Sequence, residues 1–335
     1  MHIEQIQATL KASTALLIED PLNLLYLTGV KCSSGKLLIS KKAVLLLLDS
    51  RYLGSKSSLT TALDSKENLL NFFEKEKISS LEFNAAHTSY ERFLQLQSLF
   101  PNCVPRDFRS FRGIKTKEEI EKLKKSASLL WKGFCSIRAH LKPGITEQAV
   151  SKALQLFALK HGAEALSFEP IIAFGKNSAM PHHRAGKTKL KKNDVVLIDI
   201  GLCLKGYHSD MTRTLVPKGA DPTLHKLLRI TKAAHAKALS LCRPGTAIGN
   251  LDVAVRSIFK KEGVEPLFLH ALGHGVGLQI HEFPRIKFDS PDKDTPLEEG
   301  MVITIEPGLY IAELGGVRYE DTIVITKAGY KNFYD

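Results

Sequence analysis

Four acidic residues stand at the ends of apolar segments in the second half of this 335-residue sequence. In the first pair, Asp199 ends the run VVLID and Asp210 follows a turn signal near Leu204-Lys205-Gly206. Two strands joined by such a turn would hold these carboxylates opposite or diagonal to each other on one sheet face, with Cβ atoms about 5 to 8 Å apart. Carboxylates at that distance raise each other's pKa unless a cation lies close to them.

A second pair repeats this arrangement further along the chain. Glu306 ends the run MVITIE, the segment ELGG at 313–316 signals a turn, and Glu320 follows it. Four carboxylates turned toward one another would raise each other's pKa, and burial would add to that cost. Although one such acid alone is typically a salt bridge or a solvated charge, four at repeated strand ends favour a centre of divalent metal ions.

Histidines near these acids could complete the centre. His274 lies between glycines in ALGHGVGL, where imidazole could supply one nitrogen ligand, although such a histidine alone is commonly a loop residue. His281 follows seven positions later, an odd separation that need not bring both rings to one side of an extended segment. His182 and His183 precede Asp199 on a loop, and we expect His183 to be solvated.

The elements that must position these residues form an approximate internal duplication. LKPGITE at 141–147 resembles CRPGTAI at 242–248, and each follows a helical stretch. The acid-bearing segments KNDVVLIDIG and EEGMVITIEPG match in the same order, as do SDMT and YEDT. The repeat is too long for a solenoid, so we expect a domain with pseudo-twofold symmetry.

The remaining sequence predicts a second, smaller domain. Residues 1–112 alternate short apolar runs with turn signals and helical stretches, as in a small α/β domain. Prolines and a glycine at 101–116 signal the boundary, and 113–335 forms the larger domain. That domain opens with a helix at 117–141, whose apolar residues recur at helical spacing. These residues are Ile120, Leu123, Ala127, Leu130 and Phe134.

Composition limits the partners. Lys and Arg (47) exceed Asp and Glu (35), which gives a net charge of +12 that could attract nucleic acid. However, the basic residues lack the interleaved aromatic side chains on which bases stack. We therefore expect no nucleic-acid partner. No apolar run approaches the roughly 20 residues of a membrane span, and the N-terminus does not resemble a signal peptide. With five scattered cysteines in addition, we expect a cytoplasmic protein without a disulfide framework.

Together these motifs closely resemble the pita-bread metallopeptidases, which include prolidase (Xaa-Pro dipeptidase), aminopeptidase P and methionine aminopeptidase. The resemblance covers 114–330 and reaches the first domain through PLNLLYLTG at 21–29 and LLDSRY at 47–52. It implies a small N-terminal α/β domain followed by a pseudo-twofold α+β pita-bread domain. It also implies a homodimer that hydrolyses peptides with proline at the second position.

The resemblance also implies residue roles, and all five metal-ligand positions are filled. The implied ligands of two divalent ions are Asp199, Asp210, His274, Glu306 and Glu320. Manganese is favoured as the metal, with cobalt, iron and zinc as alternatives. The implied catalytic residues are His182, His281 and Glu306, the last as general base; His270 and Arg285 would contact substrate, and Tyr310 and Arg318 would orient the first metal carboxylate. Relatives often carry glycine at the position of His183.

Three other functions fit the sequence less well. A metal-free creatinase-like hydrolase would be expected to lack ligands that are all present here. An inactive binding module of the same fold is supported only by the net charge of +12. A methionine aminopeptidase-like enzyme is disfavoured by the N-terminal domain and by the segment HEFPR at 281–285. The sequence leaves the choice between dipeptidase and aminopeptidase P open.

Overall fold

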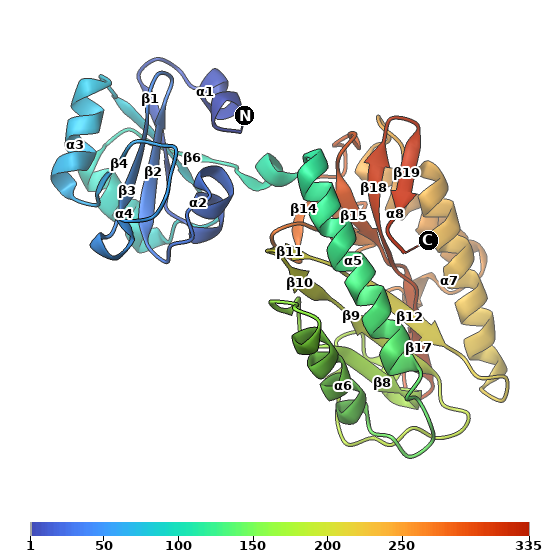
Figure 1. Ribbon diagram of the computed structural model, residues 1–335. Coiled ribbons are helices and arrows are strands. Elements are labelled where there is room, and N and C mark those ends of the chain that lie inside the picture. The colour runs from blue at the N-terminus through green and yellow to red at the C-terminus, as the bar shows by residue number, and fades with distance from the viewer. Residues whose placement is uncertain (1, 335) are drawn as a thin grey trace. The chain divides into compact units, whose positions relative to one another are not determined.

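The computed structural model describes residues 2–334 and contains two compact units, which meet in sequence between Phe108 and Arg109 (Figure 1). The first unit is built on a six-stranded sheet in the order β4-β3-β2-β1-β5-β6. Its helices are α1 (His2–Thr9), α2 (Pro21–Thr28), α3 (Lys66–Lys75) and α4 (Tyr90–Leu99), with a 3₁₀ turn at Ser50–Tyr52. Its strands are β1 (Thr14–Ile18), β2 (Gly35–Ser40), β3 (Val44–Leu48), β4 (Thr61–Leu63), β5 (Ser80–Asn84) and β6 (Cys103–Arg106).

Burial explains this sheet. Every residue of β1 is buried, as expected for a continuous apolar run at the centre of a sheet covered on both faces. Helices α3 and α4 contribute Leu69, Phe72 and Leu96 to one apolar cluster with the sheet. The predicted α/β character of this part of the chain is confirmed.

The second unit carries the acidic residues. Its helices are α5 (Lys117–Arg138), α6 (Glu147–Lys160), α7 (Pro222–Leu241) and α8 (Ile248–Lys261), with 3₁₀ turns at Arg109–Arg112, Gly175–Ala179 and Glu265–Leu267. The strands of its first half are β7 (Ala165–Leu166), β8 (Ile171–Phe174), β9 (Val196–Ile200), β10 (Leu202–Leu204), β11 (Tyr207–His208) and β12 (Met211–Leu215). Those of its second half are β13 (Gly273–Gly275), β14 (Glu282–Ile286), β15 (Val302–Ile305), β16 (Gly308–Ile311), β17 (Gly315–Arg318), β18 (Asp321–Thr326) and β19 (Gly329–Asn332).

The predicted opening helix of this unit is present as α5, which begins after a capping box formed by Thr116 and Glu119. Leu123, Leu130 and Phe134 of the predicted stripe are buried, and the helix packs against β10 and β11. Figure 1 shows α5 lying along the strands of the first half. The helix ends at Arg138, three residues before the predicted end.

The order of elements repeats as the sequence predicts. Two helices, α5 and α6, precede the acid-bearing strands β9 and β12, while α7 and α8 precede β15 and β18. In each half, the two acid-bearing strands are antiparallel neighbours in a sheet. Among residues 2–334, no helix is both long and apolar enough to span a membrane.

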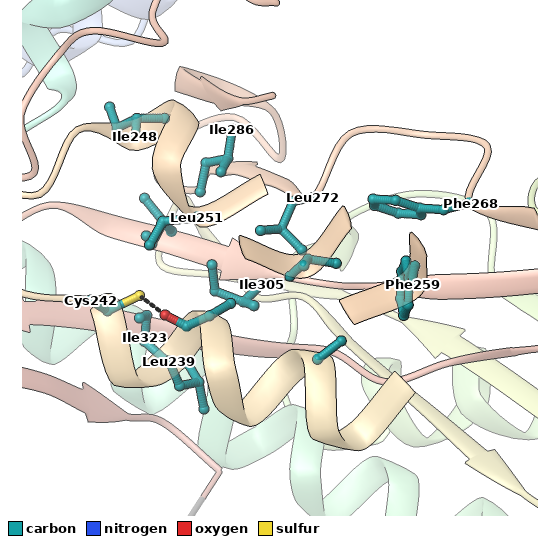
Figure 2. Close-up of a cluster of buried hydrophobic side chains, with 14 of the residues drawn as sticks. Leu239, Cys242, Ile248, Leu251, Phe259, Phe268, Leu272, Ile286, Ile305 and Ile323 are labelled. Carbon is teal, nitrogen blue, oxygen red and sulfur yellow. Dashed lines mark hydrogen bonds between the residues drawn. The ribbon is translucent and has the colours of Figure 1, made fainter. Parts of the chain in front are cut away.

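The largest apolar core supports the second half. Helices α7 and α8 pack their buried faces against β14, β15 and β18, and Figure 2 shows Leu251 and Ile305 within this cluster. Ile305 immediately precedes Glu306, so the packing of this core fixes the end of the strand from which Glu306 extends. The Cys242 thiol donates a hydrogen bond to the carbonyl of Ala238 at 3.3 Å, the contact drawn in Figure 2.

This core gives a stability prediction. Leu251 is 0% exposed, so Leu251→Ala should lower the free energy of unfolding by about 2 to 5 kcal/mol through lost burial and cavity formation. Val253 lies on the same helix but is 50% exposed, so Val253→Ala should change it by less than about 0.5 kcal/mol. Urea unfolding followed by circular dichroism measures both, and equal effects would contradict the assigned core.

Candidate metal centre

The first acidic pair lies in a hairpin with a two-residue turn. Lys205 and Gly206 form this turn with φ of 53° and 76°, and Leu204 pairs with Tyr207 beside it. This positive-φ pair matches the turns that follow the right-handed twist of a hairpin. The same register continues into β9 and β12.

The hairpin register fixes the positions of the first two acids. Asp199 lies opposite Thr212, and Asp210 stands two residues before Thr212. The two acids are therefore diagonal neighbours on one sheet face, as predicted. Both are buried.

The second pair lies where two paired segments meet. Ile305 pairs with Asp321 in one sheet and Gly308 pairs with Arg318 in another, so Glu306 and Glu320 occupy corresponding positions in the short break between them. The backbone N–H of Glu320 donates to the carbonyl of Thr212 at 3.2 Å, which joins this hairpin to the first. This hydrogen bond between the two hairpins brings all four acids together.

The turn of this second hairpin differs from the sequence prediction. Ile311 pairs with Gly315, so the loop is 312–314 and not 313–316. Gly315 and Gly316 already belong to β17, where a Cβ on Gly316 would stand only 2.4 Å from the carbonyl oxygen of Ser178. Gly316 therefore serves close strand packing, while Gly315 also holds a φ of 145° where the loop ends.

His274 joins these acids at a cluster suited to a metal ion. Ligand atoms of Asp210, His274 and Glu320 all lie within 4.8 Å of one another. His274 Nε2 is 3.6 Å from Asp210 Oδ2 and 3.5 Å from Glu306 Oε1. Its Nδ1 donates to the carbonyl of Gly275 at 3.1 Å, so the Nε2 lone pair points to the acids.

The glycines beside His274 allow this approach. A Cβ on Gly273 would stand 2.0 Å from the carbonyl oxygen of Thr304, and one on Gly275 would stand 2.1 Å from that of Phe283. Both neighbouring strands therefore pack directly against the backbone of β13. The repeated glycines of ALGHGVGL position the histidine through close strand packing.

The electrostatics of the cluster favour a bound cation. Burial and the neighbouring carboxylates raise the pKa of Asp210 and Glu320 well above their ordinary values, and burial raises the pKa of Glu306 to about 8. Asp199 Oδ1 and Glu320 Oε1 are buried without a hydrogen-bond partner among the described residues. Oxygen atoms left in this state, beside a neutral imidazole, fit divalent cations. Burial lowers the pKa of His274 to about 3, which keeps that imidazole neutral.

A hydrogen-bonded chain leads away from Asp199. Arg318 donates through Nη2 to Asp199 Oδ2 and through Nη1 to the Tyr310 hydroxyl, each at 2.5 Å. The hydroxyl in turn donates to His270 Nε2 at 2.9 Å. Gly308 leaves room for this contact, because a Cβ there would stand 2.4 Å from the hydroxyl. The structure thus connects Tyr310 and Arg318 to Asp199 and brings His270 into the same network.

The other predicted residues lie around the cluster. The rings of His274 and His281 are 4.3 Å apart, centroid to centroid, in an edge-to-face arrangement. His182 is exposed; burial lowers the pKa of both His270 and His281, and the proximity of His182 adds to the shift at each ring. Arg285 is exposed and lies opposite His274 in the β13–β14 pairing.

The expectation that His183 is solvated is wrong. Its side chain is only 12% exposed, and Nε2 lies 2.9 Å from Oε2 of Glu147, a glutamate that is 0% exposed. The sequence gives no local sign of this contact, because the partners are 36 positions apart.

Sequence reasoning missed other residues that hold the cluster. The Thr212 hydroxyl donates to Glu320 Oε2 at 2.7 Å, and that of Thr322 donates to the carbonyl of Asp210 at 2.9 Å. The spacing of acid, one residue, then threonine occurs after both Asp210 and Glu320 and could have identified them. Because alternate strand residues share a face, a threonine two positions after a buried acid points to the same side.

Comparison with known proteins shows which family this chain belongs to. Residues 121–327 match metallopeptidase family M24, and residues 3–114 match the creatinase/prolidase N-terminal domain. The chain belongs to metallopeptidase family M24. The resemblance and the fold predicted from the sequence are confirmed, including the pita-bread domain after a small N-terminal domain. A binding module and a methionine aminopeptidase-like enzyme are not favoured.

Individual relatives resemble this M24 peptidase over nearly its whole length. An Xaa-Pro dipeptidase of Pyrococcus furiosus is 34% identical over 320 residues, covering 94% of this chain and 91% of that protein. The structure of an Xaa-Pro dipeptidase from Bacillus anthracis has a TM-score of 0.93 at 29% identity, covering 100% of this chain and 97% of that one. An X-Pro aminopeptidase from Thermotoga maritima has a TM-score of 0.87 at 27% identity, covering 98% and 97%.

Proposed function

We propose that this M24 peptidase is an Xaa-Pro dipeptidase that uses divalent metal ions. The observation that carries this proposal is the buried cluster of Asp210, His274 and Glu320, within a chain 34% identical to an Xaa-Pro dipeptidase over most of both lengths. The cluster suits metal-dependent hydrolysis, and the relatives indicate the substrate class. An Xaa-Pro aminopeptidase is the second candidate, because a structure so named has a TM-score of 0.87.

Five residues would hold the metal ions. We assign this role to Asp199, Asp210, His274, Glu306 and Glu320, whose side chains converge or offer oxygens that have no hydrogen-bond partner within the described part of the chain. Bound there, divalent ions would polarise a water molecule and the scissile carbonyl for hydrolysis.

The surrounding side chains would move protons and bind substrate. Glu306 would take a proton from the attacking water and pass it to the departing proline nitrogen, a secondary amine that must be protonated. His182 and His281, near one another beside the cluster, would donate hydrogen bonds to the developing oxyanion. His270 and Arg285 would contact the bound peptide.

Arg318 and Tyr310 would keep the first metal carboxylate oriented. The two hydrogen bonds of the Arg318 guanidinium fix the rotation of Asp199 and leave its Oδ1 for a cation. A fixed carboxylate loses little conformational freedom when it binds a metal ion.

Three further properties belong to this proposal. Manganese is the proposed metal, because a ligand set of carboxylates with one imidazole suits manganese, with cobalt, iron and zinc as alternatives. The resemblance to the pita-bread family supports a homodimer, which light scattering can test. A cytoplasmic location is supported by the five cysteines, all of which carry free thiols.

Substrate length tests the proposed specificity. The manganese-loaded protein should hydrolyse an Xaa-Pro dipeptide, and its kcat/KM for Xaa-Pro-Yaa-Yaa should be at least about tenfold lower, since a dipeptidase must recognise the carboxylate next to proline. Chromatographic detection of released proline measures both reactions, and Xaa-Ala serves as the control. Preference for the tetrapeptide would replace the dipeptidase with an Xaa-Pro aminopeptidase, while cleavage of neither would contradict the substrate class.

A further inference from the structure

The two histidines proposed to face the substrate share an unusual local arrangement. His182 and His281 are both exposed beside the metal cluster. Each is followed directly by a residue whose side chain is held inside the protein, since the side chains of His183 and Glu282 are only 12% and 2% exposed. At both places, an exposed histidine ring is therefore followed directly by a residue whose largely buried side chain holds the backbone.

The first attachment, here called the Glu147 anchor, consists of Glu147 and His183. Glu147 Oε1 accepts hydrogen bonds from the Phe174 backbone N–H at 2.9 Å and the Asn177 side chain at 2.8 Å. Its Oε2 accepts from His183 Nε2 at 2.9 Å and from the Gly186 backbone N–H at 3.0 Å. The Glu147 carboxylate, in the first turn of α6, therefore accepts four hydrogen bonds from the segment 174–186, which carries His182.

The second attachment, here called the Glu282 anchor, consists of Glu282 and Arg112. Glu282 Oε1 accepts from Arg112 Nε at 2.9 Å and from the Gln279 backbone N–H at 3.0 Å, while Oε2 accepts from Lys115 Nζ at 3.4 Å. Arg112 also donates through Nη2 to the Gln279 side chain at 2.7 Å. The segment just before and after His281 is thereby fixed to the start of the second unit.

A solvated loop could satisfy its polar groups with water, so the buried carboxylates of the two anchors are not needed for that purpose. Burying an ionised carboxylate is costly, and for Glu147 the cost is offset because each of its oxygens accepts two hydrogen bonds. The gain is a loop backbone held in one position next to the reacting centre. Preorganisation of this kind matters most for groups that act in the transition state, where a displacement of about 1 Å can cost 10²-fold in rate.

We propose that each anchor positions the exposed histidine that directly precedes it for catalysis. The Glu147 anchor acts through His182. The Glu282 anchor acts through His281. This inference rests on the proposed Xaa-Pro hydrolysis, and it assigns positioning roles to residues that would touch neither the metal ions nor the substrate.

A double-mutant cycle on the Glu147 anchor tests this proposal. In the metal-loaded protein, His183→Ala should lower kcat for an Xaa-Pro dipeptide about 10- to 100-fold, with KM and bound metal unchanged. His183→Gln keeps an N–H donor for Glu147 and should recover much of the loss. In a His182→Ala background, His183→Ala should change kcat by less than about twofold, because the residue through which it acts is already absent.

A matched control and a second cycle keep the test decisive. Lys36→Gln breaks a half-buried ion pair with Asp64 in the first unit and should leave kcat unchanged. If thermal unfolding shows that His183→Ala does not fold, the Glu282 anchor is tested instead. Arg112→Gln should then lower kcat in the wild type but change it by less than about twofold in a His281→Ala background.

The outcomes separate the two levels of the proposal. Equal losses from the anchor substitution with and without the preceding histidine would overturn the positioning role, as would a loss of bound metal equal to the loss of kcat. Wild-type protein that binds metal but does not cleave Xaa-Pro would overturn the proposed function and this inference with it. Cleavage by the wild type with additive losses would overturn the inference alone.

Discussion

Glu320→Gln is expected to remove at least one bound metal ion and to lower kcat/KM by about 10³-fold or more, a loss of roughly 4 kcal/mol in transition-state stabilisation. Glu320 is 1% exposed, and it contributes to the cluster with Asp210 and His274. Its Oε2 accepts from the Thr212 hydroxyl, while Oε1 has no hydrogen-bond partner among residues 2–334. The substitution replaces a charged ligand with a neutral amide of the same shape.

The stability of the metal-free protein distinguishes this effect from misfolding. Burial and nearby acids raise the pKa of Glu320 and Asp210, which shows that their charged forms repel each other without a cation. Metal-free Glu320→Gln should therefore be at least as stable as the metal-free wild type, while added manganese should raise the Tm of the wild type more. Mass spectrometry of bound metal and thermal scans with and without manganese measure both quantities.

A buried glutamate away from the cluster provides the matched control. Glu119 is 8% exposed and caps α5. Glu119→Gln keeps an oxygen that can accept from the Thr116 backbone N–H, and should leave metal content and kcat/KM near wild type. A Glu320→Gln protein that binds metal as tightly as the wild type would remove Glu320 from the ligand set.

The geometry within each hairpin could be predicted from sequence because its determinants are local. Apolar runs ending in acids identify the strands, and the turn residues Lys205-Gly206 fix the register that makes Asp199 and Asp210 diagonal. The second turn was predicted less well, because Gly315 and Gly316 look like turn residues but are required by the close approach of Ser178. Local patterns cannot distinguish a glycine needed for a turn from one needed for packing.

The contacts between the hairpins depend on tertiary packing, which single-sequence patterns do not encode. Arg318 and Asp199 are 119 positions apart, yet their hydrogen bond orients the predicted first metal carboxylate. The family resemblance, and not spacing, suggested that connection. For Glu147 and His183 neither source was available, so a histidine expected in solvent proved to be attached to a buried carboxylate.

The second large effect is expected from Glu306→Gln, which should lower kcat by about 10³-fold while at least one metal ion remains bound. Glu306 differs from Glu320 in its surroundings, because its side chain is 17% exposed and can reach both the cluster and an incoming substrate. Burial raises its pKa to about 8 in the absence of a cation. A bound divalent cation would lower that pKa, leaving a carboxylate that can accept a proton from water and return it to nitrogen.

Comparison with Glu306→Asp separates proton transfer from metal binding. Aspartate keeps a carboxylate but is one methylene shorter, so it should recover part of the lost kcat, while glutamine cannot accept the proton at all. Metal content measured beside kcat shows which function each variant has lost. If Glu306→Gln retained normal metal content and near-normal kcat, Glu306 would not be the general base. Proton transfer would then have to be assigned to a neighbouring group, and His281, whose ring lies 4.3 Å from that of His274, would be the first to test by substitution.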